Sequence, residues 1–213
     1  MNTSEQRSWL LARTARVTVA KLLLVIFRVR VVCPERVPSS GAILAGNHVS
    51  YGDPVLLWCA APRRVRFMAK SELWRSRFLG WAITTFWAFP VKRGEPDRQA
   101  IAKATDLLKS GELVGIFPEG TRVRDGAVEP QGGVAFLAMR AGVPIVPVGI
   151  AGTDKIRPDG AILMHFPRVT FVFGEPVCPE DFDHLPSRKE RVEAITAEVM
   201  GRIAASLMEA KER

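Results

Sequence analysis

Cysteine and histidine are both scarce in this sequence, which has three of each among 213 residues. The cysteines are scattered and show no CxxC spacing, so they predict neither a disulfide framework nor a zinc site. Such usage is typical of a protein from a reducing cytosol. The histidines form no HExxH pattern, and we expect no metal centre. The residues concerned are Cys33, Cys59, Cys178, His48, His165 and His184.

Long hydrophobic runs are also missing from the N-terminal region. Its longest strictly apolar stretch covers residues 22–27, whereas a helix that spans a bilayer needs about 20 apolar residues. No small-residue cleavage site follows this stretch, so a signal peptide fits poorly. We therefore expect no transmembrane anchor.

Two common catalytic signatures are absent as well. The sequence has no GxSxG elbow, which argues against a serine hydrolase. Residues 115–122 imitate the Walker spacing of two glycines, but Thr121 stands where that motif requires lysine. Nucleotide hydrolysis is accordingly disfavoured.

The overall composition is that of one globular domain with an excess of positive charge. Apolar residues make up 47% of the chain and charged residues 24%, so extensive disorder is not expected. Thirty Lys and Arg face 22 Asp and Glu, for a formal net charge of +8. This balance favours a polyanionic partner such as a phosphorylated substrate, an anionic membrane surface or nucleic acid.

Residues 1–30 look helical and interleave large apolar side chains with arginines. We interpret this stretch as a membrane-associating segment, because basic side chains can reach the headgroups while apolar ones enter the acyl boundary. The alternative is a helix that packs on the domain and exposes its arginines to water. Residues 31–213 would then form the second part, a single domain.

Apolar runs and helical patterns alternate along the rest of the chain. Strands are predicted at residues 42–45, 65–69, 89–93, 113–117, 143–150 and 169–173. Helices are predicted to start at about residue 55, to cover 98–109 and 132–140, and to begin again at about 187. Pro144 and Pro147 favour an edge position or an irregular end for their strand. The order predicts an α/β fold: a single layered domain with a mixed, mainly parallel sheet flanked by helices.

The loop after the first predicted strand carries His48 and Asp53. Asp53 precedes Pro54, as a helix N-cap precedes a proline at the first helical position. A turn at Gly52 would let the carboxylate reach the imidazole and leave the other ring nitrogen as a base. The alternative is that Asp53 is only a cap and His48 only a hydrogen-bonded histidine at a strand end.

Four ordered motifs give the sequence a resemblance to the glycerolipid acyltransferase family. Residues 47–53 match the family's NHxxxxD motif, and residues 117–122, Phe-Pro-Glu-Gly-Thr-Arg, look like its third motif. Residues 89–93 and 143–148 resemble the second and fourth motifs, in the right order and at similar intervals. The resemblance covers roughly residues 30–180.

The resemblance implies a mechanism. His48 would be the general base that removes a proton from an acceptor hydroxyl, and Asp53 would orient it. The freed oxygen would attack the thioester of acyl-CoA or of an acyl carrier protein. Because a thioester is already activated, no cofactor and no covalent enzyme nucleophile would be needed.

The resemblance also implies a substrate-binding set. A phosphate on the acceptor needs cations, and arginine matches its geometry best. Backbone amides near Gly52 or in the third motif are alternative sites for oxyanion stabilisation. The substrate-binding candidates are Asn47, Ser50, Lys92, Arg93, Glu119, Gly120, Thr121 and Arg122.

These expectations lead to three hypotheses of function. The first is a lysophosphatidate 2-O-acyltransferase, peripheral or monotopic on the cytoplasmic face of the cell membrane, with no nucleic-acid partner. The second keeps the chemistry but takes another lysolipid, a glycolipid or an amino-acid lipid as acceptor. The third is a non-catalytic binder of membrane or nucleic acid, whose affinity would fall steeply with salt.

Overall fold

The computed structural model describes residues 17–76, 80, 88–91, 97–119, 132–157 and 164–213. Its strands are β1 (Arg30–Val32), β2 (Ala42–Gly46), β3 (Val65–Lys70), β4 (Phe89–Val91), β5 (Leu113–Ile116), β6 (Ile145–Ala151) and β7 (Thr170–Phe173). Its helices are an N-terminal helix (residues 17–26), α2 (Asp53–Ala60), α4 (Arg98–Lys109), α5 (Gly133–Ala141) and α6 (Arg188–Glu212). Short 3-10 helices are η1 (Pro34–Arg36), η2 (Ser71–Arg75), η3 (Thr153–Lys155) and η4 (Pro179–Phe182).

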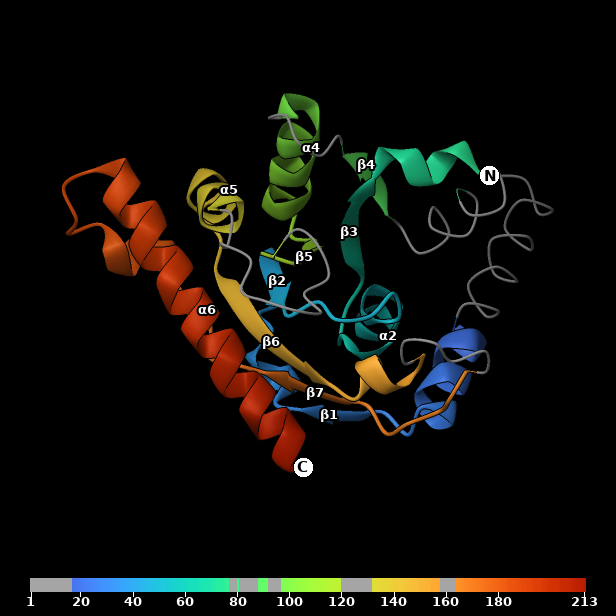
Figure 1. Ribbon diagram of the computed structural model, residues 1–213. Coiled ribbons are helices and arrows are strands. Elements are labelled where there is room, and N and C mark those ends of the chain that lie inside the picture. Colours follow the sequence, from blue (N-terminus) through green and yellow to red (C-terminus); the bar gives the residue numbers. More distant parts are fainter. Residues whose placement is uncertain (1–16, 77–79, 81–87, 92–96, 120–131, 158–163) are drawn as a thin grey trace.

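The strands form one sheet in the order β1-β7-β6-β2-β5-β3-β4 (Figure 1). Neighbouring strands are parallel except for β6 and β7, which are antiparallel. The predicted α/β fold with a mixed, mainly parallel sheet is confirmed.

Strand β2 shows how the sequence creates two layers of core. Successive side chains of a strand point to opposite faces of the sheet. Ala42 and Leu44 therefore join one hydrophobic cluster, with Leu56 of α2, while Ile43 and Ala45 join the other. Because both faces are covered, the strand is apolar at every position rather than alternating.

Helices cover both faces of the sheet. Figure 1 shows α4, α5 and α6 on one side and α2 with the N-terminal helix on the other. The helix predicted to begin at about residue 187 is present as α6, and its apolar residues Ile195, Val199 and Ile203 are all buried.

Of the two alternatives predicted for the proline-containing strand, the edge position is wrong. β6 lies inside the sheet, between β2 and β7. The register pairs Val148 with Phe173, the last residue of β7, so Pro147 lies opposite Gly174 just beyond the β7 ladder. Its carbonyl still accepts from the Gly174 amide at 2.8 Å. A proline is tolerated there because the hydrogen bond it removes lies at the end of the pairing.

The N-terminal segment is helical as predicted over residues 17–26, and residues 1–16 lie outside the described part. The helix ends earlier than expected, because Arg30 already begins β1, which pairs with β7. Leu23 and Leu24 pack against the core, and Phe27 is buried. Within the described ranges, no helix combines the length and apolar character needed to cross a bilayer.

Candidate active site

Two loops meet where parallel strands end. β2 and β5 are neighbours, with Ala45 opposite Ile116, so the residues that follow both strands leave the same edge of the sheet. In open α/β sheets this edge is where sites form. The first loop carries His48 and Asp53, and the second carries Glu119.

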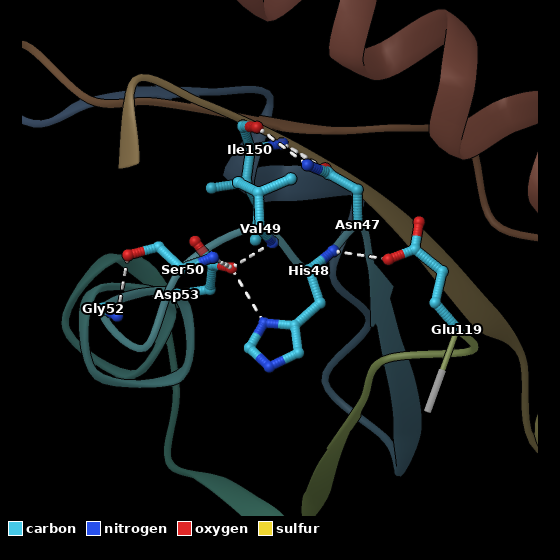
Figure 2. Close-up of polar contacts among 8 residues, drawn as sticks. All are labelled: Asn47, His48, Val49, Ser50, Gly52, Asp53, Glu119 and Ile150. Carbon is cyan, nitrogen blue, oxygen red and sulfur yellow. Dashed lines mark hydrogen bonds and ion pairs between the residues drawn. The ribbon is translucent and has the colours of Figure 1, made fainter. Parts of the chain in front are cut away.

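Asp53 is fully buried and uses one oxygen for three hydrogen bonds. Oδ2 accepts from the backbone amides of Val49 at 2.8 Å and Ser50 at 2.7 Å, and lies 2.8 Å from Nδ1 of His48 (Figure 2). The predicted contact between carboxylate and imidazole is therefore present. Oδ1 has no partner among the described residues.

The predicted role of Asp53 as a helix N-cap is wrong. Asp53 is itself the first residue of α2, Gly52 occupies the cap position, and no side chain caps the helix. The carboxylate instead turns back to the preceding loop, where two amides and an imidazole offer it three donors. A negative charge in the first turn still lies favourably at the positive end of the helix dipole.

These contacts fix the tautomer of His48. A carboxylate oxygen that accepts from two amides can only accept again, so Nδ1 carries the hydrogen in this bond. Nε2 then keeps its lone pair and points away from Asp53 (Figure 2). It has no hydrogen-bond partner in the described part of the chain, and the side chain is 13% exposed. This geometry suits a general base.

The aromatic ring of Phe117 covers one face of the imidazole. The two ring centroids lie 4.3 Å apart with an interplanar angle of 20°. Phe117 follows β5 directly and is partly buried against the core. The orientation of His48 is thus defined by a stacked ring as well as by a hydrogen bond.

Asn47 anchors the loop that carries His48 to β6. Its Nδ2 donates to the Ile150 carbonyl at 3.0 Å, and its Oδ1 accepts from the Ile150 amide at 2.8 Å. β2 pairs with β6 as far as Gly46, so this side chain continues the ladder by one step after the backbone has left it. Both polar ends of the buried amide are engaged with the protein.

Glu119 holds the loop from the other side. Its Oε2 accepts from the backbone amide of His48 at 3.0 Å (Figure 2). Burial raises the pKa of this carboxyl above its ordinary value of 4.5, and the bond from His48 offsets part of that effect. Ser50 contributes a smaller local bond, because its Oγ accepts from the Gly52 amide at 3.2 Å.

The part of the chain that holds this site resembles a known protein family. A family model described as Acyltransferase matches residues 28–151, more than half of the chain and the whole span that holds both loops. The chain belongs to the acyltransferase family.

Named relatives of this acyltransferase agree over most of its length. The 1-acyl-sn-glycerol-3-phosphate acyltransferase of Bacillus subtilis is 35% identical over 177 residues, covering 82% of this chain and 86% of that protein. The enzyme of the same name from Streptococcus pneumoniae is 34% identical over 65% of this chain and 51% of its own length. The crystal structure of the 1-acyl-sn-glycerophosphate acyltransferase PlsC from Thermotoga maritima matches with a TM-score of 0.70 and 27% identity, over 94% of this chain and 83% of that one.

The structure brings five of the acyltransferase's predicted site residues together: Asn47, His48, Ser50, Asp53 and Glu119. The remaining five lie outside the described residues: Lys92, Arg93, Gly120, Thr121 and Arg122. No group of three or more potential metal ligands occurs within the described ranges.

Sequence reasoning missed two members of the site. Ile150 supplies only backbone groups, so its side chain carries no signal of that role. Phe117 had a usable signal, because it stands directly after β5 and therefore beside the residues that follow β2. An apolar residue next to a motif is easily assigned to the core, and Phe117 also serves the core.

Proposed function

We propose that this acyltransferase moves a fatty acyl group from a thioester donor to the sn-2 hydroxyl of lysophosphatidic acid, giving phosphatidic acid. The observation that carries the proposal is the buried Asp53 paired with His48, whose Nε2 is open, in a chain that spans 86% of a curated enzyme with this activity. The donor is acyl-CoA or an acyl carrier protein, and the net charge of +8 would favour the acidic carrier.

The proposed reaction needs one proton relay. Nε2 of His48 removes the hydroxyl proton of the acceptor as its oxygen forms a bond to the thioester carbonyl carbon. Asp53 stabilises the imidazolium that forms, because its carboxylate already accepts from Nδ1 at 2.8 Å. The tetrahedral intermediate then expels the thiolate, which accepts the proton from Nε2 and leaves as a free thiol. General base catalysis of this kind contributes about 10²- to 10⁴-fold.

Acceptor binding is assigned from the motifs. Lys92, Arg93 and Arg122 are proposed to bind the phosphate, since charge-assisted bonds from a guanidinium fit its oxygens. The run from Glu119 to Thr121 is proposed to contact the glycerol part. Asn47 and Ser50 belong to the same proposed site, and their described contacts support the loop that would receive the substrate.

The enzyme is proposed to work as a peripheral protein at the cytoplasmic face of an anionic membrane. Its N-terminal helix exposes Leu22, Val25 and Ile26, at 55%, 73% and 37%. Exposed Lys21 lies on the same helix, and a charged head above an apolar face suits the lipid boundary. Phe166, 53% exposed, lies next to this helix with its ring 5.5 Å from that of Phe27.

A single pooled reaction tests the proposal. Purified protein is incubated with a mixture of acyl-CoA and acyl carrier protein donors and a mixture of lysolipids, with free thiol and lipid products measured together. Phosphatidic acid as the dominant product, with stoichiometric thiol, is the expected result. Acylation of a different lysolipid or of a glycolipid instead would show that lysophosphatidic acid is not the acceptor. The absence of thiol release from every mixture would refute the proposal.

A further inference from the structure

The His48 imidazole needs more than its bond to Asp53 to be held in place. A hydrogen bond at Nδ1 fixes one point of the ring, whereas rotation about the bond to the ring has only broad, roughly two-fold preferences. Nε2 must nevertheless point at the acceptor hydroxyl, because a reacting atom misplaced by about 1 Å can cost about 10²-fold in rate. The plane of the ring has to be set by some other contact.

Phe117 makes that contact. At a centroid distance of 4.3 Å and an interplanar angle of 20°, the rings are in van der Waals contact across their faces. Carbon atoms attract best at about 3.5–4.0 Å, so no water fits between them. The ring of Phe117 packs beside the end of β2, since a Cβ placed on Gly46 would lie 3.6 Å from one of its carbons.

Phe117 itself packs against a second phenylalanine. The ring of Phe67 lies parallel to it, with an interplanar angle of 12° and a centroid distance of 6.2 Å. Phe67 takes that place because its partner across the sheet is Gly115, which has no side chain. A Cβ on Gly115 would lie 2.3 Å from a carbon of the Phe67 ring. The absence of a side chain at Gly115 therefore leaves room for the Phe67 ring, which in turn lies against the ring of Phe117.

We propose that Phe117 is a positioning residue of the acyltransferase site. Its ring, supported by Phe67 over Gly115, sets the plane of the His48 imidazole so that Nδ1 meets Asp53 while Nε2 faces the acceptor. The role of Nε2 rests on the proposed function, whereas the stacking and its effect on His48 do not. Phe117 itself takes no part in proton transfer.

Nuclear magnetic resonance of the full chain tests the stacking without substrate. The protein has three histidines, so ring-labelled histidine gives three sets of signals, and His48→Ala assigns one of them. The carbon-bound ring protons of His48 should lie upfield of those of His165 and His184, because they sit over an aromatic face. Phe117→Tyr should keep that shift and Phe117→Leu should abolish it. A wild-type His48 signal without an upfield shift would overturn the proposal.

Steady-state kinetics tests the consequence for catalysis. Phe117→Leu should lower kcat about 10- to 100-fold with the KM values for both substrates changed by less than about twofold, since the base is misaligned and the binding groups are intact. Phe117→Tyr should restore kcat. A Phe117→Leu enzyme with wild-type kcat would refute the proposal. If Phe117→Leu does not fold, the upfield shift of the His48 ring protons in the wild-type and Phe117→Tyr spectra decides whether the rings are stacked. If no lysolipid is acylated, the proposed function fails and the spectra still stand.

Discussion

Asp53 binds both the loop and the proposed base, His48, through a single oxygen, Oδ2. Removing the carboxylate therefore has two separable consequences, one for stability and one for chemistry. The backbone amides of Val49 and Ser50 need a hydrogen-bond acceptor whether or not it is charged. The imidazolium that would form in the proposed reaction needs the negative charge.

Asparagine and alanine at position 53 should separate these consequences. Asp53→Ala leaves two part-buried amides without a partner, and we expect the free energy of unfolding to fall by about 2–4 kcal/mol. Asp53→Asn keeps an acceptor and should lose only about 1 kcal/mol. Both variants should lose at least about 100-fold in kcat. Urea titration and thiol release measure the two effects, and an Asp53→Asn enzyme with full activity would contradict the assigned role.

Glu119 should make stability depend on pH. Burial raises the pKa of its carboxyl above 4.5 in the folded protein. Over the range just above 4.5 the folded state then binds more protons than the unfolded chain, so the contribution of Glu119 to stability falls as pH rises. Glu119→Gln cannot ionise but can still accept from the His48 amide. The stability of the variant relative to wild type should rise from below pH 4.5 toward neutrality in denaturant titrations at several pH values. A stability of the variant relative to wild type that falls over this range would contradict the burial of the carboxyl.

At the scale of elements, α6 and β6 approach so closely that one position on the strand admits only glycine. A Cβ on Gly149 would lie 2.2 Å from the carbonyl carbon of Ser206 in α6. Such an overlap forces the helix away from the sheet and from β7 beyond it. The close approach places the long helix over the strand that Asn47 uses as its anchor.

Two glycine-to-alanine substitutions form a matched pair for this contact. Gly149→Ala should lower the free energy of unfolding by about 3 kcal/mol or more, because the overlap is with backbone rather than with a movable side chain. Gly201→Ala, on the exposed side of α6 with nothing within 4 Å, should raise it by up to about 1 kcal/mol. Thermal or urea unfolding measures both. Equal stabilities would show that the helix does not pack as described.

The elements themselves were largely predictable, because their signals are local. A buried strand such as β2 is apolar throughout, and α6 carries its apolar residues at spacings of three and four. β1 was missed since three residues next to a helix carry little pattern, and its partner β7 is distant in sequence. The edge assignment from Pro147 failed because a proline's effect depends on which neighbour its missing hydrogen bond would have faced.

The site was predictable to a similar degree and for a similar reason. The pairing of His48 with Asp53 follows from a short turn, which the sequence indicates through Gly52. The contacts of His48 with Glu119 and Phe117 cross from one strand end to another, and they follow only once β2 and β5 are known to be neighbours. The periodicity of apolar residues and the spacing of motifs do not predict the order of the strands in the sheet.

At the scale of the whole molecule, the proposed membrane contact lies on one exposed helix. Val25 is 73% exposed, so Val25→Glu should leave stability within about 0.5 kcal/mol. It should weaken binding to anionic vesicles about tenfold, since it removes an apolar side chain proposed to enter the lipid and adds a charge that the anionic surface repels. Met208→Glu changes an equally apolar residue, 65% exposed on α6, and serves as the control. Vesicle co-sedimentation compares them, and equal losses would place the contact elsewhere.

The central claim is that one imidazole acts as the base. It is tested most directly by thiol release from acyl-thioester and lysophosphatidate with His48→Ala beside His184→Ala. His184 is an exposed histidine that is hydrogen-bonded to the carbonyl of Asp181. His184→Ala is therefore the control for replacing a histidine with alanine elsewhere in the chain. We predict that His48→Ala lowers kcat by about 10²- to 10⁴-fold in a folded protein while His184→Ala keeps wild-type activity. A folded His48→Ala protein that turns over at the wild-type rate would contradict the account.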